Sequence, residues 1–88
     1  MQNLEDTTEL LKGLHKSIEL YHSSKREING SEDSPEFRLI RTKALSTMNF
    51  SISEMRNHLK RAKELGIPYN PMISQASNVT GYNYHATE

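Results

Sequence analysis

The segment FSISEMRNHLKRAKELGIP, residues 50–68, decides the fold, because it contains an amphipathic helix together with its stop signal. Apolar side chains recur at intervals of three and four residues, at Ile52, Met55, Leu59 and Ala62. Such spacing places them on one face of a helix. Gly66 favours a left-handed end, Ile67 can fold back on the last turn, and Pro68 cannot continue the helix. The sequence therefore predicts a packing helix that ends at Leu65.

The same periodicity extends upstream to residue 37, and Ser34, Pro35 and Glu36 are typical of a helix start. One continuous helix over residues 35–65 is therefore the favoured interpretation. The alternative is a break near Asn49, because Ser51 and Glu54 match a capping box. A break there would produce a three-helix bundle.

A first helix is predicted over residues 4–28, capped by Asn3 and ended by the Asn29–Gly30 turn. Its apolar positions share one face and are Leu4, Leu11, Leu14, Ile18, Tyr21 and Ile28. Thr7 and Lys25 would fill the remaining positions of this seam. Gly13 is expected to weaken the helix interior by about 1 kcal/mol relative to alanine.

The predicted fold is all-α, with an antiparallel helical hairpin over residues 1–68 and an irregular or partly disordered tail over residues 69–88. Four apolar side chains lie off the seam and would stay partly exposed: Leu10, Leu20, Leu39 and Phe50. A homodimer that forms a four-helix bundle would cover them. We therefore expect the hairpin to dimerise.

The composition limits the classes of protein to which the chain can belong. Its 88 residues make one domain, and the absence of cysteine fits a reducing compartment. Neither a membrane-spanning run nor a secretory signal is apparent, so a cytoplasmic protein is expected. Proteins of this size and composition are common in bacterial and phage genomes.

The expected function is that of a small non-enzymatic interaction module, which regulates, inhibits or adapts a larger protein partner. Exposed aromatic side chains often anchor such interfaces. Phe50 and the tail tyrosines Tyr69, Tyr82 and Tyr84 are the predicted partner-binding residues. No catalytic residue, cofactor or metal ion is expected.

A nucleic-acid-binding regulator is the alternative function, with Arg56, Lys60, Arg61 and Lys63 on phosphates. Residues 34–66 hold seven basic and three acidic groups, whereas residues 1–33 hold four basic and seven acidic groups. Two oppositely charged helices that pair along their flanks would explain the same pattern. The net charge of zero favours this second explanation over a polyanion-binding protein.

Histidines and glutamates that could bind a metal ion are the basis of a third, enzymatic hypothesis. Glu19 and His22 have the spacing found in di-metal helical bundles, and His15 lies one turn before Glu19. A hairpin folded at residues 29–34 would place His22 opposite Lys43 and His58 opposite Thr7. The possible ligands of the two helices would then lie far apart within one chain, so no metal site is predicted.

Overall fold

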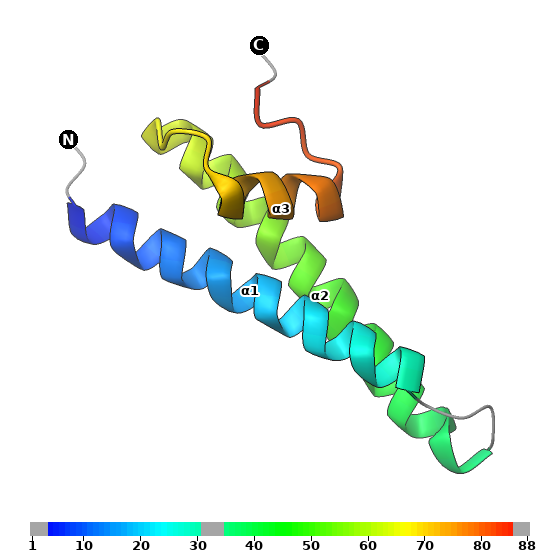
Figure 1. Cartoon of the computed structure of the whole chain (residues 1–88). Helices are drawn as coiled ribbons and strands as arrows, with labels where there is room; N and C mark the ends of the chain where they lie inside the picture. Colours follow the sequence, from blue (N-terminus) through cyan, green and yellow to red (C-terminus); the bar gives the residue numbers. More distant parts are fainter. Residues whose placement is uncertain (1–3, 31–34, 86–88) are drawn as a thin grey trace.

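Over residues 4–30 and 35–85, which the computed structural model describes, the chain consists of three helices and no strand (Figure 1). They are α1 (Leu4–Gly30), α2 (Pro35–Leu65) and α3 (Pro71–Thr80). The first two form an antiparallel hairpin, and α3 packs mainly on α2 with a smaller contact to α1. The all-α prediction is therefore confirmed. The predicted caps Asn3 and Ser34 and the side chain of Leu4 lie outside the described part of the chain.

Helix α2 is continuous, so the alternative of a break near Asn49 is wrong. The hydroxyl of Ser51 donates to the carbonyl of Met48 at 2.7 Å, inside the helix, and does not cap a new one. Ser51 is fully buried, and this bond satisfies its hydroxyl without interrupting the helix. The unbroken apolar periodicity outweighs the weak local helix propensity.

The end of α2 is the one predicted from the sequence. Gly66 takes the left-handed conformation with φ 72°, and its N–H donates to Lys63. The N–H of Ile67 donates to the carbonyl of Ala62 at 3.0 Å, and the Ile67 side chain is buried. These bonds form a Schellman motif, which satisfies the last carbonyls of the helix.

The prediction of an irregular tail is wrong for residues 71–80, which form α3. Asn70 caps this helix, since its side-chain oxygen accepts the N–H of Ile73 at 2.9 Å, and Pro71 follows in the first turn. Gly81 ends it in the left-handed conformation. The Asn-Pro start was present in the sequence, but apolar positions on this ten-residue helix are too few to give a clear period.

The core lies at the end of the hairpin that α3 covers. Leu14 of α1, Met55 and Leu59 of α2, and Ile73 of α3 are all fully buried. We call this part the covered half, meaning residues 10–18 of α1, residues 51–65 of α2, and α3.

The other end of the hairpin, next to the connection between α1 and α2, is less buried. We call it the open half, meaning residues 20–30 of α1 and residues 35–50 of α2. Here Leu39 is 69% exposed, and Ile40 and Leu45 are also exposed. In Figure 1 the first turn of α2 extends beyond the end of α1, so α1 does not cover it.

The two helices pair in a different register from the one expected. His58 lies against Gly13, not Thr7, because the start of α2 overhangs the end of α1. This shift moves each facing pair by six residues, which is about 1.7 helical turns.

Candidate functional site

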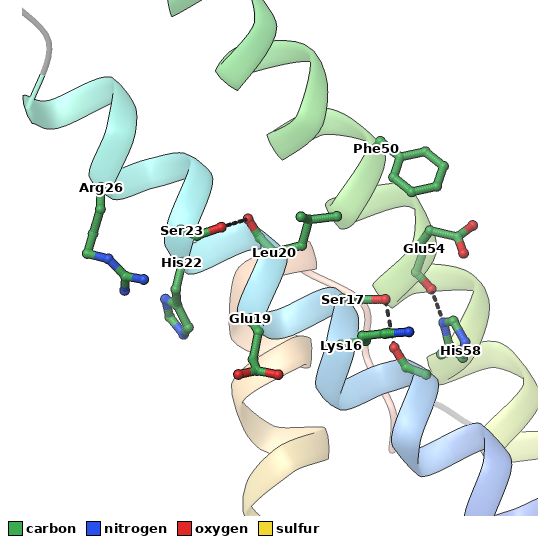
Figure 2. Close-up of a pocket in the computed structure, with 11 residues that line it drawn as sticks. Lys16, Ser17, Glu19, Leu20, His22, Ser23, Arg26, Phe50, Glu54 and His58 are labelled. Carbon is green, nitrogen blue, oxygen red and sulfur yellow. Dashed lines mark hydrogen bonds between the residues drawn. The ribbon is translucent and has the colours of Figure 1, made fainter. Parts of the chain in front are cut away.

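A groove between α1 and α2 exposes two large apolar side chains, Leu20 from α1 and Phe50 from α2. Leu20 is 36% exposed and Phe50 is 59% exposed. Figure 2 shows Leu20 reaching toward α2, whereas Glu19, His22 and Arg26 point away from it. The prediction that Leu10, Leu20, Leu39 and Phe50 stay at least partly exposed is confirmed, and Leu10 is the member that also packs partly against the core.

A second groove adjoins the first at Leu20 and is lined on α2 by Lys43 and Thr47. The first groove is lined on α2 by Phe50 and Glu54. We call Leu20, Lys43, Thr47, Phe50 and Glu54 together the Phe50 surface. It carries one basic and one acidic residue around an apolar centre, so its formal charge is balanced.

At the end of the first groove that Gly13 and His58 line, α1 packs closely on α2. A Cβ atom added to Gly13 would lie 2.5 Å from Nε2 of His58, so only glycine fits there without movement. The His58 ring is held in place, since its Nδ1 lies 2.6 Å from the carbonyl of Glu54. Gly13 therefore allows the two helices to approach closely. The packing gained in this way offsets the helix-propensity cost of glycine.

Three buried serines lie along the seam between the two helices, and they were not predicted from the sequence. Ser17 donates to Gly13 at 2.9 Å and Ser24 donates to Leu20 at 2.6 Å, while Ser51 bonds within α2 as described above. Each hydroxyl is satisfied by its own helix, so burial leaves no unpaired group. Their spacing of seven residues in α1 was the available signal. Lys25, which was assigned to the seam, is exposed.

The predicted partner-binding tyrosines flank α3: Tyr69 precedes it, and Tyr82 and Tyr84 follow it. Tyr69 is 46% exposed, and its ring centroid lies 4.4 Å from that of His85. Tyr82 is partly buried against the core. Tyr84 is buried, and its hydroxyl donates to the carbonyl of Ile67 at 2.5 Å. Tyr84 therefore serves the fold, and Tyr69 is the tyrosine of this group that faces solvent.

Burial raises the pKa of the Tyr84 phenol above its ordinary value of 10.0, and the neighbouring Tyr82 adds to the rise. The phenol is the donor in its bond to Ile67, so the protonated form is the one that the fold uses.

The four basic residues of the nucleic-acid alternative do not form one free stripe. Arg56 donates to the carbonyl of Thr80 at 2.6 Å and so binds the end of α3. Arg61 pairs with Glu64 at 3.2 Å, and Lys63 also has an interaction within the chain. Arg61 projects about 100° around the helix from Lys60. These contacts favour a structural role for Arg56 and a solvent-exposed ion pair for Arg61 over phosphate binding.

The histidines take part in separate local interactions. His15 lies 3.2 Å from Glu19, one turn away on α1. His22 instead contacts Gln75 of α3 at 2.6 Å. Within residues 4–30 and 35–85, no group of three or more possible metal ligands comes together. Nor does any helix in these ranges have an apolar run long enough to cross a membrane.

Searches for relatives found no protein family, curated protein or solved structure that matches this chain at a significant level.

Proposed function

We propose that this chain is a small non-enzymatic interaction module that binds another polypeptide through the Phe50 surface. The observation that carries the proposal is the 59% exposure of Phe50 beside Leu20 in an open groove. Full burial of an exposed phenylalanine stabilises by about 1.5–3 kcal/mol, and a protein partner would recover the share that belongs to the exposed part of Phe50. Its role as regulator, inhibitor or adaptor of a larger partner is part of this proposal.

Balanced charge at the Phe50 surface supports a protein partner over a polyanion. Lys16 and Arg26 line the same groove as Glu19 and Glu54, so the groove attracts neither sign strongly. Nucleic acids demand an excess of basic side chains.

Site-specific photo-crosslinking tests the proposal. Phe50 is replaced by the photoreactive analogue p-benzoylphenylalanine, and Asn49, its exposed neighbour on another side of α2, is replaced in a matched control. We expect the probe at position 50 to give a discrete adduct that nuclease leaves intact and that mass spectrometry of the cross-linked peptides identifies as two joined polypeptides. A nuclease-sensitive adduct, or equal labelling from both positions, would contradict the proposal.

A further inference from the structure

We propose that the occupant of the Phe50 surface is a second copy of this chain, bound with its α2 antiparallel to the first. This inference rests on the proposed function and names the partner of the same site. The argument starts from a stripe on α2 that is independent of the buried face.

The stripe is formed by two series of residues, each at intervals of seven. One series is Glu36, Lys43 and Phe50, and the other is Thr47, Glu54 and Arg61. At 3.6 residues per turn all six fall within about 60° of the helix circumference. Phe50, Lys43 and the two outermost members, Glu36 and Arg61, are exposed, and Thr47 and Glu54 are partly exposed. The stripe is therefore accessible along most of α2.

The charges of the stripe are complementary to themselves under reversal. Counted from the midpoint between Met48 and Asn49, Lys43 and Glu54 lie equally far on opposite sides, as do Glu36 and Arg61. A two-fold axis at this midpoint sets Lys43 against the second copy's Glu54. It also sets Glu36 against the second copy's Arg61. Each contact occurs twice, and all four join opposite charges.

The apolar centre falls on the same axis. Phe50 lies beside the second copy's Thr47, and the two Phe50 residues are offset by about 4.5 Å along the helix axis. This offset allows the rings to pack against each other, with Leu20 of α1 beside them at the groove. An antiparallel arrangement of paired seam positions at intervals of seven is the geometry of helical bundles. With α1, each copy contributes two helices, which gives four.

A parallel arrangement does not satisfy the same groups. It would place Lys43 against the second copy's Lys43 and Glu54 against the second copy's Glu54, and like charges in contact destabilise. Charge complementarity therefore selects both the partner and its direction. The second copy leaves Tyr69 exposed for any larger partner, because Tyr69 lies beyond the end of α2.

Sedimentation equilibrium of the full chain tests the inference, over protein concentrations from about 1 µM to about 1 mM. We expect a monomer–dimer equilibrium, and Phe50→Ala should shift the chain to monomer. Lys43→Glu and Glu54→Lys should each weaken association about tenfold, since each reversal makes two contacts repulsive. The double variant restores opposite charges in both contacts, so it should recover the wild-type affinity. Lys60→Glu, an exposed reversal off the stripe, is the matched control and should change nothing.

A wild-type chain that stays monomeric throughout this range would overturn the inference. So would a dimer that Phe50→Ala leaves unchanged, or single reversals that the double variant fails to rescue. The proposed function is tested separately, because a photo-adduct from position 50 to a different polypeptide would support it even if the chain is monomeric. Circular dichroism of each variant checks that the helices are retained, which we expect because these side chains lie outside the core.

Discussion

The two halves of the hairpin have similar apolar patterns but very different burial. In the covered half Leu59 is fully buried, whereas in the open half Leu45, which lies two heptads earlier on the same side of α2, is 46% exposed. Leu59 belongs to the same buried cluster as Ile73 of α3, whereas Leu45 is not part of that cluster. Periodicity therefore places side chains on a face, and the large side chains at its margin are buried where α3 adds a third layer.

The largest expected effect compares leucines from the two halves. Leu59→Ala removes a fully buried side chain from between the helices and should lower the free energy of unfolding by about 2–5 kcal/mol. Leu45→Ala, two heptads earlier in the open half, should cost clearly less at low protein concentration, because its side chain is 46% exposed. Urea denaturation followed by circular dichroism measures both. Similar losses from the two variants would contradict the contrast between the halves.

A second prediction concerns the close approach of the helices at Gly13. A Cβ at this position meets His58, so Gly13→Ala should lower the free energy of unfolding by about 1 kcal/mol despite its better helix propensity. In a His58→Ala background the same change should instead stabilise by about 1 kcal/mol. A double-mutant cycle with chemical denaturation measures the coupling.

Gly30 provides the control for this cycle, because a Cβ there would meet nothing within 4 Å. Gly30→Ala should be neutral or slightly stabilising with either residue at position 58. A Gly13→Ala chain that is more stable than wild type would show that the helices do not approach closely at this point.

The third prediction tests how α3 is attached to the covered half. Asn70→Ala removes the cap of α3 and should cost about 1 kcal/mol of stability. Asn78→Ala, at an exposed position on the same helix, should have no measurable effect on stability. Thermal denaturation compares the two variants. Equal midpoints would mean that the cap contributes nothing to the covered half.

The smallest predicted effect depends on pH and involves Tyr84. Since burial raises its pKa in the folded state, its contribution to stability is complete below about pH 10 and is lost as the pH rises through the folded-state pKa. Tyr84→Phe should cost about 1 kcal/mol at neutral pH, because the bond to Ile67 is lost.

Denaturation curves between neutral and strongly alkaline pH distinguish the titration of Tyr84 from that of the lysines. Stability of the wild type should decline more steeply with pH than that of Tyr84→Phe. Parallel declines would show that the Tyr84 phenol does not contribute to the alkaline loss.

Much of this fold can be predicted from the sequence, but only those features that depend on residues close together in the chain. Pro35, Leu65 and Gly66 mark the limits of α2 as predicted, because caps and stop residues act within one turn. The contact of Gly13 with His58 could not be predicted from the sequence, because it depends on the register in which α1 and α2 pack. The exposure of Phe50 was predicted from its position off the seam. The burial of Tyr84 was not, because it requires the position of α3.

Native-state hydrogen exchange along α2 tests the account most directly, because it reports the local stability of each backbone amide. At low protein concentration we predict slow exchange for residues 55–62, under α3, and clearly faster exchange for residues 39–45 in the open half. Equal protection of these two stretches would contradict the account, since it would mean that α3 does not set the difference between the halves.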